Sequence, residues 1–517
     1  MLTGDMLRRS AVRFPRKIAI TYRGPDRRAQ VSYAHLDAQA NQLAHALLDL
    51  GLEKGAKVSM LARNLPEYGA VFFGVARTGC VLNNISVLYA PDELAWTLNK
   101  SDTEVLIFDA ALADKVAAVR AQCPGIGHYV MIGSSGVDAG TVSFDAFIHG
   151  QPDTPPDIVL CEDDAFCMTY TGGTTGRPKG VLASHRARDV TAHTVMVEEN
   201  IGPRDVVAIV TPLFHVAALN IMFQPAILAG ASTVFVTPWS TENFIQAVRD
   251  EGVTATFMVP TQANALATLP DLETMGLDSW TKLSFAGAPM PDWVQADLMK
   301  RLPRLRLTQI YGQSEVGVIA ALPWYRLPEK LGCVGQQPYN VDVAVLRPDG
   351  SRTDPGEMGE VASRGDNLML EYYNEPEQTA AFFKLGNGWG LTGDIGVSDE
   401  EGFITLVDRA KDMLISGGEN VYPKEIEDAI YQLDEVAECA VFGIPDDRWG
   451  ELPAAYILLK PGRTLTEEAV IAQCEARLAR LKRPRLIKFV DSFPKTPIGK
   501  IQKTILKEPY WQKRKKI

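Results

Sequence analysis

Apolar residues recur in two patterns along the chain, and each pattern predicts one kind of element. Between residues 34 and 50 they fall at three- and four-residue spacing, and Gly51 follows, which predicts an amphipathic helix that stops at the glycine. A second helical pattern covers 66–78. The short apolar runs that predict strands are 58–62, 104–108, 205–212, 232–238, 255–260 and 282–289.

Apolar runs that alternate with helical patterns are typical of α/β domains with mostly parallel sheets flanked by helices. Ligands of such open sheets bind outside the carboxyl ends of the strands, so we expect binding residues directly after the apolar runs. The spacing of apolar residues changes near residue 408, where a polar segment is followed by a region with its own strand and helix patterns. The strands predicted there are 437–444 and 453–460, and the predicted helix is 466–481. The pattern therefore predicts a large N-terminal domain and a small α+β domain at the C-terminus.

Length and composition narrow the class of protein. A chain of 517 residues exceeds one compact core, which predicts two or more domains. A net charge of −11 argues against a nucleic-acid partner, because such binding rests on clustered Lys and Arg. The seven cysteines include no CxxC pair, so we expect reduced thiols and neither a disulfide nor a zinc framework. Charged residues interrupt the N-terminal apolar positions and no long apolar run follows, which favours a soluble cytoplasmic protein without a transmembrane segment.

The stretch YTGGTTGRPKG at 170–180 carries the chemistry of a phosphate loop. Its glycines let the backbone approach a ligand closely, its threonines offer hydroxyls and Lys179 offers a cation. A glycine-rich surface turn is the alternative. Lys179 follows Pro178 and not a glycine, so the stretch does not match the Walker pattern GxxxxGK[ST].

A second glycine pattern, GWGLTG at 388–393, matches the dinucleotide fingerprint GxGxxG. That fingerprint should follow an apolar strand and open a helix. Here KLGN precedes it and a turn-rich stretch follows, so we reject a Rossmann site.

Six separated motifs make the chain resemble the adenylate-forming superfamily of acyl-CoA synthetases, nonribosomal-peptide adenylation domains and beetle luciferases, on the branch of AMP-dependent acyl-CoA synthetases. The motifs are YTGGTTGRPKG at 170–180, YGQSE at 311–315, TGD at 392–394, DRAKD at 408–412, GGENVYP at 417–423 and PKTPIGK at 494–500. The resemblance implies an N-terminal AMP-binding domain at 1–407, a hinge at 408–412 and a mobile C-terminal domain at 413–517. It also implies a two-step reaction through an acyl-AMP, with ATP, Mg²⁺ and coenzyme A.

The same resemblance assigns the nucleotide contacts. Tyr311 would stack on adenine, Ser314 would touch the α-phosphate and Glu315 would hold Mg²⁺. Asp394 would accept the ribose hydroxyls and Arg409 could add a donor, although an aspartate in a turn is a common structural feature. The predicted phosphate ligands are Thr171, Gly172, Gly173, Thr174, Thr175, Gly176 and, as a secondary cation, Lys179.

Lys500 matches the lysine that contacts the α-phosphate and the reacting carboxylate during adenylation. Lys411 occupies the hinge position, and Gly418 would lie beside a pantetheine channel during thioester formation. Gly172 stands where serine is frequent, so we expect weaker contacts to ATP.

The resemblance also indicates an acyl pocket. His215 lies where the family often keeps an aromatic or histidine side chain over the acyl group, although a simply packed histidine is an equal alternative. Amino-acid-activating relatives carry an aspartate there, so an α-amino acid is disfavoured. The other pocket candidates are Phe214, Asn220, Ala286, Gly287, Ala288, Gln309 and Gly312.

None of these pocket residues is charged, which favours a neutral aliphatic or aromatic acid. The main hypothesis is an acyl-CoA synthetase. The alternatives are a free-standing acyl-AMP ligase that loads a carrier protein and a nonenzymatic nucleotide sensor or scaffold that has kept the fold. The sequence leaves the acid and the oligomeric state open, a homodimer being one option.

Overall fold

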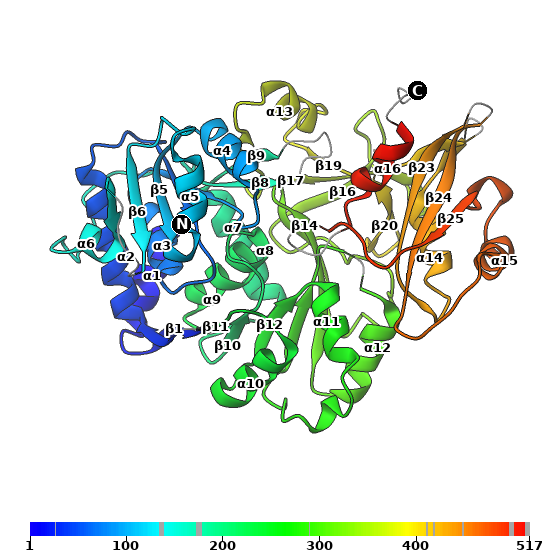
Figure 1. The fold of residues 1–517 in the computed structure, drawn as a ribbon, viewed down its shortest axis with the longest axis horizontal. Coiled ribbons are helices and arrows are strands. Elements are labelled where there is room, and N and C mark those ends of the chain that lie inside the picture. Colours follow the sequence, from blue (N-terminus) through cyan, green and yellow to red (C-terminus); the bar gives the residue numbers. More distant parts are fainter. Residues whose placement is uncertain are drawn as a thin grey trace. The chain divides into compact units, whose positions relative to one another are not determined.

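The computed structural model describes residues 1–25, 27–133, 139–171, 178–288, 290–409, 412–416, 419–446, 449–495 and 501–511, with the backbone alone at 408, 409, 415, 419 and 420. The chain folds into two compact units (Figure 1). The first comprises 1–331, 335–342 and 363–390, and the second comprises 332–334, 343–362 and 391–517. The domain limits at 407 and 413 and the hinge between them stay predictions.

The first unit contains two mostly parallel sheets. In the first sheet the central strands from β14 to β1 are parallel and the two outer pairs, β14–β15 and β1–β2, are antiparallel. Its strands in sheet order are β15 (Gly317–Leu322), β14 (Arg306–Gln313), β13 (Lys282–Phe285), β12 (Ala255–Met258), β10 (Val206–Ile209), β11 (Ser232–Val236), β1 (Ile18–Arg23) and β2 (Arg28–Ser32).

The second sheet is also mostly parallel, and its antiparallel pairs are β18–β9 and β9–β8 at one edge. Its strands in sheet order are β18 (Glu371–Tyr372), β9 (Lys179–Ser184), β8 (Ala165–Thr171), β4 (Val81–Asn84), β3 (Lys57–Leu61), β5 (Thr103–Asp109), β6 (His128–Ile132) and β7 (Thr141–Ser143).

One large apolar core joins the facing sides of these two sheets. It contains buried side chains from both sheets and from helices that lie against them. The helices that contribute are α1 (Thr3–Arg13), α2 (Tyr33–Asp49), α3 (Glu67–Val75), α7 (His185–Glu198) and α9 (Gln224–Ala229). A smaller core covers the other side of the second sheet through α4 (Pro91–Lys100) and α5 (Ala113–Arg120).

The remaining α-helices described in the first unit lie in the connections between strands. They are α6 (Phe144–Ile148), α8 (Val216–Ala218), α10 (Thr241–Glu251), α11 (Pro260–Ala267), α12 (Asp292–Arg301) and α13 (Pro376–Phe382), with the π-helix η2 (Leu219–Phe223) between α8 and α9.

The second unit holds two smaller sheets. The first has the strand order β16 (Asp342–Leu346), β17 (Met358–Arg364), β19 (Gly390–Ser398) and β20 (Ile404–Arg409). The second has the order β22 (Glu419–Val421), β21 (Leu414–Ser416), β24 (Gly450–Leu459) and β23 (Val436–Asp446), with β25 (Leu486–Phe489) beside β24. The α-helices described in this unit are α14 (Pro423–Ile430), α15 (Glu467–Arg477) and α16 (Lys503–Trp511). Side chains of α14 and α15 share one core with this sheet.

Most of the predicted elements form close to their predicted limits, and the α/β class with a large and a small part is confirmed. The predicted helix at 466–481 ends earlier, because Leu478 adopts an extended backbone after Arg477. The runs 205–212 and 282–289 also overshoot their strands, which end at Ile209 and Phe285. The rejected GxGxxG stretch leads into the antiparallel strand β19 and not into a helix.

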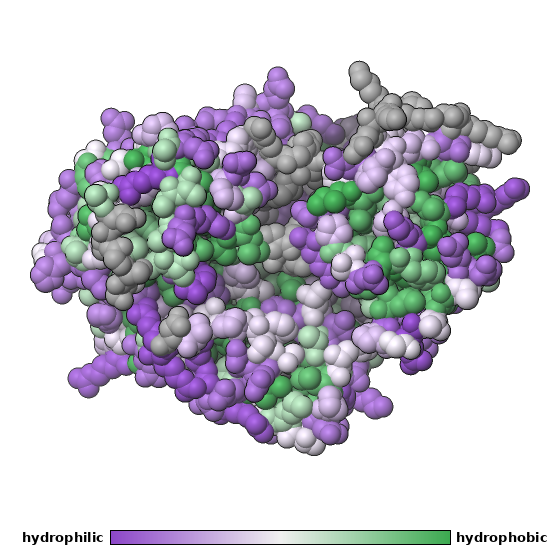
Figure 2. Space-filling model, viewed as in Figure 1, coloured by the Kyte–Doolittle hydropathy of each residue, from purple (hydrophilic) through white to green (hydrophobic). Residues whose placement is uncertain are grey.

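Across the described residues, no helix is long and apolar enough to span a bilayer. On the face drawn in Figure 2, hydrophilic side chains surround smaller groups of apolar ones.

Candidate functional site

The predicted phosphate loop connects two antiparallel neighbours, β8 and β9. Thr171 ends β8 and lies opposite Lys179, the first residue of β9. Both strands are largely buried, so the hairpin is anchored in the sheet up to the point where the loop begins. The Lys179 ammonium lies 5.1 Å from the centre of the Tyr372 ring, within the range of a cation–π contact.

The YGQSE motif forms the turn between β14 and β15. Tyr311 is buried opposite Ala320, whereas Ser314 and Glu315 are half-buried at the turn itself. The strands approach so closely that a Cβ atom on Gly312 would lie 1.9 Å from the carbonyl oxygen of Gly317. Glycine at 312 is therefore required by the hairpin, beyond any role in an acyl pocket.

A short segment, residues 369–373, joins this turn to the phosphate hairpin. The backbone N–H of Met369 donates to the carbonyl of Glu315 at 2.8 Å, and that of Tyr373 donates to the carbonyl of Gly180 at 2.8 Å. Between them, the Tyr372 hydroxyl donates to Glu315 Oε1 at 2.8 Å. The segment thus contacts the first sheet at Glu315 and the second sheet along β9.

Sequence reasoning did not find Tyr372. It lies in the stretch LEYYNEP, which carries no recognisable motif, and its neighbours come from distant parts of the chain. Only the pairing of β18 with β9, Tyr372 opposite Val181, brings it to the site.

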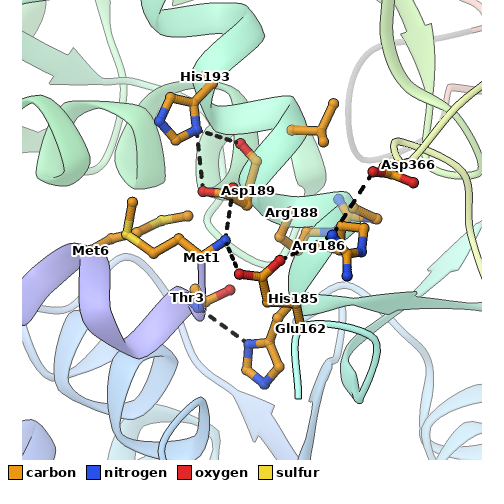
Figure 3. A network of polar contacts seen from close by, with 12 residues as sticks. Met1, Thr3, Met6, Glu162, His185, Arg186, Arg188, Asp189, His193 and Asp366 are labelled. Atoms are coloured by element: carbon orange, nitrogen blue, oxygen red, sulfur yellow. Dashed lines mark hydrogen bonds and ion pairs between the residues drawn. The ribbon is translucent and has the colours of Figure 1, made fainter. Parts of the chain in front are cut away.

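Arg188, also absent from the sequence predictions, supports the YGQSE turn from helix α7. It is buried, its Nη2 donates to the carbonyl of Ser314 at 3.4 Å, and burial lowers its pKa. Figure 3 shows the polar network around this part of α7. The ion pairs drawn there are Met1 α-amine with Glu162 (2.9 Å) and with Asp189 (3.0 Å), Arg186 with Glu162 (3.0 Å) and with Asp366 (4.0 Å), and His193 with Asp189 (3.2 Å).

The acyl-pocket candidates follow or lie on strands of the first sheet. Gln309 lies on β14 opposite Phe285, the last residue of β13, and Ala286, Gly287 and Ala288 come next. Gly287 has a φ of +88°, and a Cβ atom there would meet nothing within 4 Å. These residues therefore share the carboxyl edge of the sheet with the segment after β10, as expected for a ligand site of an open α/β sheet.

That segment after β10 carries Phe214, which is buried, and His215, which is half-buried. His215 Nδ1 accepts the backbone N–H of Ala217 at 3.2 Å and so begins α8. Removal from water lowers the pKa of His215 to about 4. The imidazole is thus neutral near pH 7, with its proton on Nε2.

Asn220 is buried on η2, the π-helix that follows α8. Its amide donates to Gln224 Oε1 at 3.0 Å, and its Oδ1 atom has no hydrogen-bond partner. π-Helical turns occur frequently at functional sites, because they displace a side chain from the regular helical ladder.

In the second unit, Asp394 on β19 pairs in register with Arg409 on β20. Asp394 is 5% exposed, and its backbone N–H donates to Thr392 Oγ1 at 3.1 Å. The preceding Gly393 N–H donates to Glu360 Oε1 at 3.1 Å, so the TGD motif is fixed by polar contacts on both sides.

Several predicted site residues lie outside the described residues, and their roles stay predictions. They are Gly172, Gly173, Thr174, Thr175 and Gly176 of the phosphate loop, Lys411 of the hinge, Gly418 and Lys500.

Comparison with known proteins identifies the family. The AMP-binding enzyme family matches residues 7–373, and the AMP-binding enzyme C-terminal domain matches residues 425–500. The chain belongs to the AMP-binding enzymes. A feruloyl-CoA synthase of Amycolatopsis sp is 34% identical over 476 residues, 92% of each chain. The long-chain-fatty-acid–CoA ligase FadD13 of Mycobacterium tuberculosis is 34% identical over 523 residues, 98% of each chain.

The fold of this AMP-binding enzyme also matches solved structures. The anthranilate CoA ligase AuaEII in complex with anthranoyl-AMP superposes with a TM-score of 0.88 at 26% identity, covering 99% of this chain and 97% of that one. The predicted superfamily, its acyl-CoA synthetase branch and the enzyme class are confirmed.

Proposed function

We propose that this AMP-binding enzyme is an acyl-CoA synthetase that converts a neutral aliphatic or aromatic carboxylic acid to its CoA thioester. The acid would attack the α-phosphate of ATP to give an acyl-AMP and pyrophosphate, and the thiol of CoA would then displace AMP. The observation that carries the proposal is similarity along more than nine-tenths of the chain to enzymes named as CoA ligases of both an aromatic and a fatty acid.

The predicted site residues suit the first step. A carboxylate is a poor electrophile until its oxygen becomes part of a phosphate leaving group, so the enzyme must hold the phosphates for in-line attack. Thr171 and Lys179 would bind the β- and γ-phosphates, Ser314 would contact the α-phosphate, and Tyr311 would stack on adenine. Asp394 and Arg409 would bind the ribose hydroxyls.

Glu315 fits the role of a Mg²⁺ ligand. Its carboxylate accepts one hydrogen bond from Tyr372 and keeps further lone pairs for a hard cation. Among the described residues, no group of three or more His, Cys, Asp or Glu side chains could hold a metal. A Mg²⁺ ion held at Glu315 would neutralise phosphate charge, and Mg²⁺ usually keeps water and substrate phosphates among its ligands.

The test is pyrophosphate release with a panel of hydroxycinnamic, benzoic and fatty acids, followed by mass spectrometry of the products with CoA. The proposal requires acid-dependent pyrophosphate release and a CoA ester of the same acid. Adenylate formation without a CoA ester, together with transfer to a pantetheinylated carrier protein, would favour the acyl-AMP ligase. Binding of ATP with no pyrophosphate release for any acid would favour a nucleotide sensor.

A further inference from the structure

Tyr372 stands between the two parts of the nucleotide site that come from different sheets. Its hydroxyl donates to Glu315 Oε1 at 2.8 Å, and its ring centre lies 5.1 Å from the Lys179 ammonium. We propose that Tyr372 is a positioning residue that sets the Glu315 carboxylate for Mg²⁺ and holds Lys179 toward the phosphates. This proposal rests on the proposed function, because it assumes that MgATP is the nucleotide.

The side chain is well placed for this task because its backbone is held at two points and its ring at a third. Residue 372 pairs with Val181 of β9, its N–H donates to Thr379 Oγ1 at 3.0 Å, and its ring meets Phe382 edge-on with the ring centres 6.3 Å apart. A tyrosine held in this way loses little freedom when its hydroxyl binds a carboxylate.

The chemistry of a metal-binding carboxylate explains why such a partner matters. A hydrogen bond to one oxygen orients the carboxylate, so the other lone pairs point in a fixed direction before the cation arrives. Loss of such a supporting contact typically weakens metal binding about tenfold to a hundredfold. Contact with the electron-rich ring face similarly restricts the flexible Lys179 side chain.

The neighbouring Tyr373 provides a matched control. It lies on the same short segment, yet its hydroxyl donates to Asp102 Oδ2 at 2.8 Å and its ring faces Lys57 at 4.5 Å. Tyr373→Phe therefore removes the same hydroxyl from the next residue without touching Glu315 or Lys179.

The decisive experiment compares Tyr372→Phe with Tyr373→Phe in the full chain. Binding of Mn²⁺, measured by electron paramagnetic resonance in the presence of ATP and without acid, should weaken about tenfold in Tyr372→Phe and stay unchanged in Tyr373→Phe. The Mg²⁺ concentration for half-maximal pyrophosphate release should rise by a similar factor, and excess Mg²⁺ should restore kcat. Affinity for metal-free ATP should stay unchanged in Tyr372→Phe and fall in Tyr372→Leu, which also removes the ring below Lys179.

A double-mutant cycle with Glu315→Gln distinguishes an effect that acts through Glu315 from a nonspecific structural effect of the substitution. If Tyr372 acts through Glu315, then Tyr372→Phe should have no further effect on Mn²⁺ binding in the Glu315→Gln background. Additive effects, or equal losses in Tyr372→Phe and Tyr373→Phe, would overturn the proposal. Because Mn²⁺ binding needs no acid, these outcomes stay distinct from a failure of acyl-CoA synthesis.

Discussion

His215 shows how the surroundings of one residue fix its chemistry. Burial lowers its pKa to about 4, and its Nδ1 is already used as an acceptor for the Ala217 N–H. The imidazole therefore neither gains nor loses a proton in the neutral range. Its proposed role over the acyl group is therefore one of shape and hydrogen bonding.

From this we predict the behaviour of His215→Phe. The pH dependence of acid-dependent pyrophosphate release should keep the wild-type shape from about pH 6 to about pH 9, because the replaced group does not titrate there. The KM for the acid should change about tenfold while the KM for ATP stays constant. Disappearance of a limb near pH 6.5 in the variant profile would show that the histidine does titrate in the wild-type enzyme.

Glu199, directly after α7, gives a prediction about stability. Burial raises the pKa of its carboxyl to about 8, against a contact with the Ser284 hydroxyl that favours the charged form. From about pH 5 to about pH 8 the folded protein holds a proton that the unfolded chain has released, so stability falls as the pH rises through this interval. The slope for such a group approaches about 1.4 kcal/mol per pH unit.

Glu199→Gln should remove this dependence. Urea unfolding at pH 6 and at pH 8.5 should show a variant that gains stability relative to the wild type as the pH increases, because the amide never has to ionise. A constant difference between the two proteins at both values would mean that Glu199 is already ionised at the lower pH.

At the level of elements, the close packing of the β14–β15 hairpin predicts a large effect of replacing Gly312. Gly312→Ala would place a Cβ atom 1.9 Å from the Gly317 carbonyl oxygen, so the strands must separate and the turn that carries Ser314 and Glu315 must move. Displacement of catalytic groups by about 1 Å can cost about a hundredfold in rate, and we expect a loss of that order in pyrophosphate release.

Gly252→Ala is the control for this substitution. Gly252 ends α10 with a φ of +66°, and a Cβ atom there would meet nothing within 4 Å. The variant should lose about 1 kcal/mol of stability from backbone strain and keep its activity. Comparable activity in the two variants would contradict the assigned role of the hairpin.

The elements also show what sequence can and cannot predict. Apolar runs located β10 and β13 because burial on both faces leaves a continuous apolar pattern. They did not locate the C-terminal ends of these strands. Val210 and Ala286 are apolar but lie beyond the strand ends, in the short stretches that lead to Pro212 and Pro289. Tyr372 could not be predicted, because its position depends on which strand pairs with β9, a choice made by packing across the whole unit.

At the scale of the whole molecule, the two proposed half-reactions, adenylation and thioester formation, lead to a prediction about Lys500. If Lys500 has the predicted role, Lys500→Ala should reduce acid-dependent pyrophosphate release on the order of a hundredfold to a thousandfold, because the substitution removes a cation that would stabilise developing charge. CoA ester formation from supplied acyl-AMP should continue at close to the wild-type rate. Both rates can be followed separately by pyrophosphate release and by thioester mass spectrometry.

Lys495→Ala is the matched control, because Lys495 lies in the same motif and pairs with Glu438 at 2.6 Å. It should leave both half-reactions near their wild-type rates. If Lys500→Ala left adenylation unchanged, the role that the motif implies would be refuted.

The short strand β18 also has a consequence for the solubility of fragments. It is the outermost strand of its sheet and covers β9, in which Val181, Leu182 and Ala183 are buried. A fragment ending at residue 342 would expose this apolar edge with unpaired N–H and C=O groups, a template for self-association. A fragment that continues to Gly390 would keep the edge covered, so we expect it to stay monomeric where the shorter fragment self-associates.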